Sequence, residues 1–218
     1  MRIHDLGLMD YRTAWAAQEA THEEVLAGGE ETLLLVEHPP VITFGRRPGG
    51  ERNLLTPEPQ LAAMGVELVQ SDRGGDVTFH GPGQIVAYPI VRIAEHGLSV
   101  SGYVHALENV VIDTLAQFGI RGQLDASAIG VWVDLGGKLA KICALGVRIR
   151  RGVSLHGIAL NVDTDLRNFN LIVPCGLVER PVTSVRQILG PDGPTMSEVR
   201  QALAGSFQAA FGSSNLAG

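Results

Sequence analysis

The sequence predicts an α+β fold in which a mixed or antiparallel sheet carries flanking helices on one side. Two segments, residues 11–27 and 101–118, repeat apolar residues at helical spacing. Several shorter runs are continuously apolar or alternate with period two, as strands do. These runs occur in blocks instead of alternating strictly with helices, which favours an α+β arrangement over a repeated βαβ one.

In the first part of the chain, the helix at 11–27 ends at Gly28 and Gly29, which favour termination. The run TLLLVE at 32–37 predicts a buried strand, because it is apolar almost throughout and is followed by two prolines. Residues 41–44 predict a second short strand. Residues 45–59 are rich in glycine and proline and predict a loop.

The middle of the chain predicts two strands, a long helix and a β-meander. The strands are VELVQ at 66–70 and IVAYPIV at 85–91, and the helix at 101–118 ends near Gly119. The meander follows, with strands at 129–134, 139–149 and 153–162.

Residues 197–211 predict a final helix with Ser197 as its N-cap. We expect residues 1–211 to form a single domain, since this length supports one sizeable core. The last residues, 212–218, are small and polar and predict a flexible tail.

Composition excludes several classes of function. The net charge of -6 argues against nucleic-acid binding, which requires clustered lysine and arginine. The two cysteines form no CxxC pair and no disulfide framework, so we expect neither a metal nor a redox site. The first residues lack the apolar core of a signal peptide, and no apolar run approaches the roughly 18 residues of a membrane span. We therefore expect a soluble cytoplasmic protein.

Cys175 lies between proline and glycine in VPCG, where the backbone bends and a nucleophile is useful. Free cysteines are, however, often buried and inert. A reactive thiol needs a nearby base, and the chain offers His80, His156 and Lys141.

Lys141 is the only charged residue on one face of the strand predicted at 139–149. Strict alternation places it with Cys143 on that apolar face, while Lys138 points to water. Such a lysine either extends its amine to the sheet edge or is desolvated and exchanges protons near neutral pH.

The glycine-rich segment RGGDVTFHGPGQ at 73–84 allows close approach of the backbone. It matches neither a Walker loop nor a dinucleotide fingerprint. It is either a hairpin with a tight turn or the wall of a pocket that His80 faces. His156 is either a satisfied core histidine or a support for the same pocket.

Several segments together resemble the lipoyl(octanoyl) transferase family. These are YRTAWAAQ, EHPPVITFGRR, RGGDVTFHGPGQIVAYPI, KICALGVRIRRGVSLHGIALNV and VPCGL, in this order over roughly residues 8–190. The resemblance implies the fold of the biotin and lipoate protein ligases. It implies a nucleophile at Cys175 and an acid/base lysine at Lys141.

The resemblance also implies an acyl pocket. Its residues would be Arg73, Gly74, Gly75, Asp76, Val77, Thr78, Phe79, His80, Ala144, Leu145, Gly146, Gly157, Ile158 and Ala159.

The implied activity is transfer of an octanoyl group from acyl carrier protein, through a cysteine thioester, to a lysine of another protein. The implied acceptors are the lipoyl domains of 2-oxoacid dehydrogenase complexes and the glycine cleavage H protein. No cofactor is required, because a thioester is already activated. An acidic carrier would meet the exposed basic residues, for which the candidates are Arg46, Arg47, Arg148, Arg150 and Arg151.

Three other functions remain open at this point. One is an ATP-dependent lipoate or biotin ligase of the same fold, which needs no cysteine. The second is a cysteine hydrolase, in which water accepts the acyl group. The third is an acyl-binding module without catalysis.

Overall fold

A large mixed sheet forms the centre of the molecule in the computed structural model, which describes residues 1–173 and 180–212. Its strands, in spatial order, are β1 (Arg2–Leu8), β2 (Thr32–Glu37), β6 (Gln84–Ile90), β10 (Val153–Asn161), β9 (Leu139–Arg150), β8 (Ala128–Asp134) and β7 (Gly122–Asp125). β1 pairs with β2 in parallel, and every other pair is antiparallel. The predicted meander is confirmed as β8, β9 and β10.

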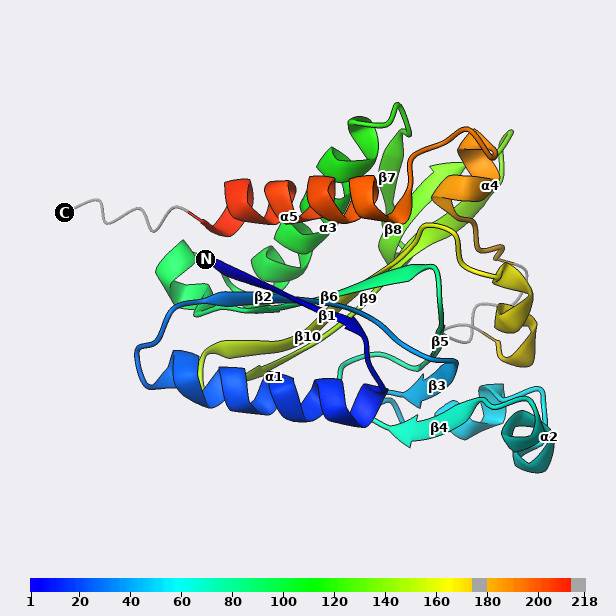
Figure 1. The fold of residues 1–218 in the computed structure, drawn as a ribbon, viewed down its shortest axis with the longest axis horizontal. Helices are drawn as coiled ribbons and strands as arrows, with labels where there is room; N and C mark the ends of the chain where they lie inside the picture. Colours follow the sequence, from blue (N-terminus) through cyan, green and yellow to red (C-terminus); the bar gives the residue numbers. More distant parts are fainter. Residues whose placement is uncertain (174–179, 213–218) are drawn as a thin grey trace.

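Helices cover both faces of this sheet, so the prediction of helices on one side was wrong (Figure 1). Helix α1 (Tyr11–Leu26) packs on one face, and α3 (Val100–Ala116) and α5 (Met196–Phe211) pack on the other. The continuous apolar run of β2 reflects this, because Leu33 and Leu35 face α3 and α5 while Leu34 and Val36 face α1. Within residues 1–173 and 180–212, no helix is long and apolar enough to span a membrane.

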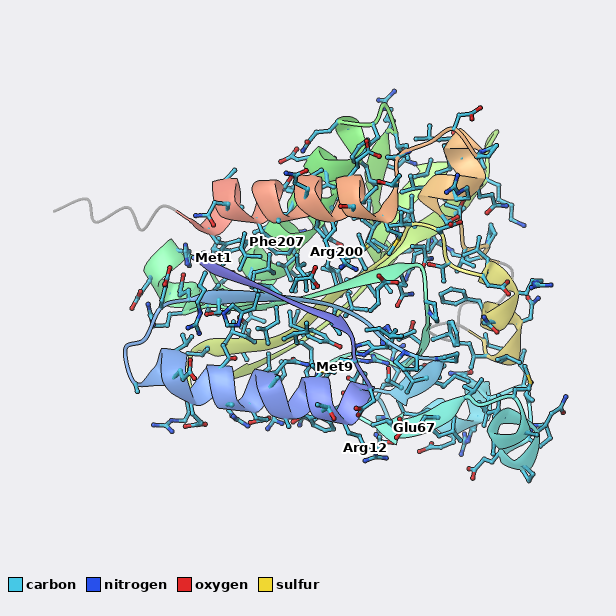
Figure 2. The ribbon with its side chains drawn as sticks, viewed as in Figure 1. Met1, Met9, Arg12, Glu67, Arg200 and Phe207 are labelled. Atoms are coloured by element: carbon cyan, nitrogen blue, oxygen red, sulfur yellow. The ribbon has the colours of Figure 1, made fainter. Side chains whose placement is uncertain are left out.

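A second sheet adjoins one end of the first (Figure 1). Its strands are β4 (Glu67–Gln70), β3 (Val41–Phe44) and β5 (Val77–His80), in that order. Figure 2 shows Arg12 of α1 beside Glu67 of β4, and the Arg12 Nε lies 2.8 Å from the carboxylate. The Tyr11 hydroxyl also donates to Ser71 Oγ at 3.0 Å, so the start of α1 joins the two sheets.

Short helical turns complete the chain. They are η1 (Gly50–Asn53), α2 (Glu58–Ala63), η2 (Ile93–His96), η3 (Leu166–Leu171) and α4 (Val185–Leu189). The segment predicted as loop at 45–59 therefore contains η1 and the start of α2. The N-cap of α5 is Thr195, not Ser197, because Thr195 and Glu198 form a reciprocal capping box.

Candidate functional site

A narrow hollow opens on the α1 side of the large sheet, between that sheet and the small one. It brings together most of the residues that the resemblance implied for the pocket. Those that line it are Arg73, Gly75, Asp76, Thr78, His80, Ala144, Leu145, Gly146, His156, Gly157, Ile158 and Ala159.

The floor of the hollow consists of small residues on two neighbouring strands. Ala144 and Gly146 of β9 lie directly opposite Ala159 and Gly157 of β10. Because these four residues project at most a methyl group, an apolar chain can lie close against the sheet. The floor therefore suits an extended aliphatic ligand.

The loop at 73–76 lies across β9 and forms the roof. The Gly74 amide donates to the Val147 carbonyl at 2.9 Å. A Cβ added to Gly146 would lie 2.8 Å from the Gly74 carbonyl oxygen, so this approach requires glycine. The buried Arg73 guanidinium donates to the Thr43 carbonyl at 2.6 Å, which joins the roof to β3.

Three residues implied by the resemblance do not line this hollow. Val77 and Phe79 point to the opposite side of β5, into a core where the Phe79 and Phe169 rings lie 5.7 Å apart. Gly74 instead lines a second, outer hollow, which shares Gly75 and Gly146 with the first. The two hollows are therefore neighbours along the roof loop.

Histidine and tyrosine side chains close the end of the hollow near α1. The Tyr11 and His80 rings stack with centroids 5.9 Å apart, and His38 Nε2 lies 2.8 Å from the Tyr88 hydroxyl. Burial lowers the pKa of His80 well below its ordinary value and lowers that of His38 as well. Burial likewise raises the pKa of Tyr88. These groups are thus neutral hydrogen-bonding groups at physiological pH.

Sequence reasoning did not assign Tyr11, Val86 and Tyr88 to this pocket, although all three line it. The available signal was a tyrosine in the otherwise apolar run IVAYPIV, whose hydroxyl needs a polar partner when buried.

Lys141 is buried on β9, with 8% of its surface exposed, whereas Lys138 is exposed. Its Nζ donates to the Ile129 carbonyl at 3.0 Å and lies 4.7 Å from the centre of the Trp132 ring. The side chain lines the outer hollow beside Ile129 and Gly146. It therefore lies near the end of the small-residue floor.

The prediction that Lys141 and Cys143 share a strand face was wrong. Val131 pairs with Cys143 but Trp132 pairs with Lys141, so Ile142 has no counterpart on β8. This bulge interrupts the alternation, and Lys141 lies with Ala144 while Cys143 packs into the core beneath α3. Burial raises the pKa of the Cys143 thiol far above its ordinary value, which makes this cysteine a poor nucleophile.

Cys175 lies outside the described residues. Before this segment, the Val173 amide donates to the Asn53 carbonyl at 2.7 Å. After it, the Lys141 amide donates to the Pro181 carbonyl and the Thr183 amide donates to the Lys141 carbonyl, both at 2.9 Å. The chain that follows residue 179 thus runs along Lys141.

The fold is that of the lipoate and biotin protein ligases. Lipoate-protein ligase A bound with ATP superposes with a TM-score of 0.76 at 19% identity, covering 96% of this chain and 84% of the other. A bi-partite lipoate protein ligase from Thermoplasma acidophilum, studied with its E2 lipoyl domain, gives 0.75 at 17% identity, with coverage of 96% and 82%. At these identities the likeness establishes the fold alone.

The chain belongs to the lipoyl protein ligase A/B catalytic domain family, whose profile matches residues 10–208. The octanoyltransferase of Nitratidesulfovibrio vulgaris is 48% identical over 217 residues, covering 100% of this chain and 97% of the relative. The octanoyltransferase of Chloroflexus aggregans is 48% identical over 213 residues, with coverage of 97% and 95%.

Proposed function

We propose that this protein is an octanoyltransferase of lipoate biosynthesis in which Cys175 carries the acyl group and Lys141 moves the protons. The observation that carries this proposal is the floor of small residues that leads to a buried lysine. The backbone of that lysine is hydrogen-bonded to Pro181 and Thr183, close in sequence to Cys175. Full-length identity of 48% to octanoyltransferases supports it.

The reaction needs two acyl transfers. The Cys175 thiolate attacks the donor thioester carbonyl, and the donor thiol departs with a proton from the Lys141 ammonium. The acceptor lysine then attacks the Cys175 thioester, and Lys141 accepts the proton that this amine loses. The second step regenerates the Cys175 thiolate, so no bond of ATP is spent.

The donor is octanoyl acyl carrier protein, and the acceptors are lipoyl domains of 2-oxoacid dehydrogenase complexes and the glycine cleavage H protein. The fold neighbour from Thermoplasma acidophilum was studied with an E2 lipoyl domain, which supports an acceptor of that type. Arg46 and Arg47 are exposed, and Arg47 lines the outer hollow, which supports entry of an acidic donor there.

Intact mass spectrometry with octanoyl acyl carrier protein tests the proposal. Without ATP, the protein should gain the mass of one octanoyl group and lose it when a lipoyl domain is added. Cys175→Ala should form no adduct, while the matched Cys143→Ala should keep most of it. An adduct on Cys143, or transfer that requires ATP and survives Cys175→Ala, would contradict the proposal. The second result would indicate a ligase.

A further inference from the structure

Glu108 is a buried acid on α3 that neither the pocket nor the proposed chemistry uses. Only 4% of its surface is exposed. Its Oε1 accepts the Gly130 amide hydrogen at 3.0 Å, and its Oε2 lies 3.0 Å from His105 Nδ1. A buried carboxyl group is costly unless hydrogen bonds satisfy it, so its place on the core side of β8 calls for a reason.

The Gly130 amide belongs to the peptide unit that joins Ile129 to Gly130. The carbonyl of this same unit accepts the hydrogen bond from Lys141 Nζ at 3.0 Å. A trans peptide is planar, and its N–H and C=O point in opposite directions. An acceptor that holds the N–H on one side of β8 therefore directs the carbonyl toward the lysine on the other side.

The flexibility of Gly130 explains why the Ile129–Gly130 peptide needs a hydrogen bond from another element to fix its orientation. Its φ of +133° is a conformation that other residues rarely adopt, and glycine also reaches many alternatives. A Cβ at this position would lie 2.8 Å from the Cys143 carbonyl oxygen and 3.1 Å from Lys141 Cε. The lysine chain thus packs directly over a residue that cannot carry a side chain, so the orientation of the peptide must be fixed from elsewhere.

We propose that Glu108 is a positioning residue for Lys141, which acts by holding the Ile129–Gly130 peptide with its carbonyl toward the lysine amine. The inference rests on the proposed role of Lys141 in acyl transfer. Hydrogen bonds in one chain polarise each other, so a carboxylate on the N–H also strengthens the carbonyl as an acceptor. Glu108 itself is buried and lines neither hollow, so it acts through the peptide and not on the substrate.

Three substitutions of Glu108 distinguish the effect of its hydrogen-bond acceptor position from the effect of its negative charge. Glu108→Gln keeps an oxygen that can accept the Gly130 amide hydrogen, so its rate should stay within about threefold of the parent. Glu108→Asp keeps the charge but withdraws the acceptor by one methylene, and Glu108→Ala removes it. Both should slow acylation on the order of tenfold or more, in keeping with misplacement of a proton-transfer group.

The measurement is single-turnover acylation by octanoyl acyl carrier protein at increasing donor concentrations. The maximal rate should fall while the half-saturating donor concentration stays within about twofold, because the acyl pocket is unchanged. Asp113→Ala is the matched control, since this acid is exposed on the same helix. If Glu108→Asp were acylated faster than Glu108→Gln, the positioning role would be overturned, because the charge of residue 108 would then matter and the position of its acceptor would not.

The Gly130 amide gives a readout that does not depend on activity. Its proton resonance in a ¹⁵N-labelled sample should move upfield in Glu108→Ala and much less in Glu108→Gln, as the hydrogen bond is lost or kept. Lys141→Ala serves as the kinetic reference. If it is slow and Glu108→Ala matches the parent, only this inference fails. If Lys141→Ala itself matches the parent, the proposed function fails, and this inference with it.

Discussion

His156 Nε2 lies 2.6 Å from Asp72 Oδ1, and Asp72 also forms an ion pair with Arg148. The residue before the roof loop is therefore fastened to both strands that form the floor, β10 through His156 and β9 through Arg148. His156 holds this contact with a left-handed backbone, at φ +57°. Burial, followed by the charge of Arg73, lowers the pKa of His156 to about 3.

This pKa predicts a loss of stability in mild acid. In the unfolded chain His156 titrates near 6.5, so below this pH the unfolded state binds a proton that the folded state refuses until about pH 3. The free energy of unfolding should then fall by up to about 1.4 kcal/mol per pH unit from this group.

His156→Asn tests that prediction, because asparagine tolerates the left-handed conformation. The variant should be less stable than the parent at pH 7.5, yet lose less stability between pH 7 and pH 5 in urea unfolding. Equal losses in the two proteins would show that His156 is not the group responsible. The buried His38 and His80 should account for part of the loss that remains.

The small-residue floor predicts that chain length can be changed at Ala144, which faces Ala159 across the two strands. Ala144→Leu should slow acylation from an octanoyl donor on the order of a hundredfold and leave a butyryl donor little affected. The two chains differ by four methylenes, worth about 3 kcal/mol at roughly 0.8 kcal/mol each when buried. Single-turnover rates with both donors measure this ratio.

Ala62→Leu is the control for the floor, because Ala62 is exposed on α2 and does not line the hollow. It should leave both rates unchanged. An Ala144→Leu variant that retains the parent's preference for octanoyl would show that the acyl chain lies elsewhere.

Much of the fold follows from local sequence pattern, because periodicity determines which segments form long helices and buried strands. The helix predicted at 11–27 is α1, and the strand at 32–37 is β2. The edge strands β1 and β7 were not predicted, since an edge strand buries little and its sequence, such as RIHDLGL, carries only a weak apolar pattern.

The geometry of the site was harder to predict from the sequence pattern, because it depends on one inserted residue. Ile142 has no partner on β8, and this bulge moves Lys141 to the face opposite Cys143. Alternation along β9 alone contains no signal of such an insertion. The contact between Glu108 and Gly130 is likewise set by tertiary packing, because the two residues lie 22 positions apart and belong to a helix and a strand.

Four of the five candidate docking residues divide into two groups, which sharpens the prediction for carrier docking; the fifth, Arg151, is exposed at the turn between β9 and β10. Arg148 pairs with Asp72 and Arg150 pairs with Glu19, so their charges are already compensated. Arg46 and Arg47 are exposed beside the outer hollow. The on-rate for acyl carrier protein should fall as salt rises from about 0.05 to 0.5 M, because exposed charges are screened.

Stopped-flow binding of Arg46→Ala/Arg47→Ala should show a lower on-rate at low salt and a flatter salt profile than the parent. Arg150→Ala should keep the parent's profile. A parent on-rate that does not change with salt would mean that charge does not steer the carrier to this face.

The two neighbouring lysines of β9 should differ sharply in their contribution to the reaction. Lys141 is buried between the Ile129 carbonyl and the Trp132 ring, whereas Lys138 is exposed at the end of the strand. Lys141→Ala should lower the single-turnover rate on the order of a hundredfold or more, the usual contribution of a general acid or base. Lys141→Arg should not restore it, because a guanidinium holds its proton at neutral pH.

Lys138→Ala is the matched control, and its single-turnover rate should stay within a few-fold of the parent. Circular dichroism verifies that all three variants are folded. If Lys138→Ala were inactive and Lys141→Ala active, the proton transfer would belong to Lys138 and its assignment to Lys141 would be wrong.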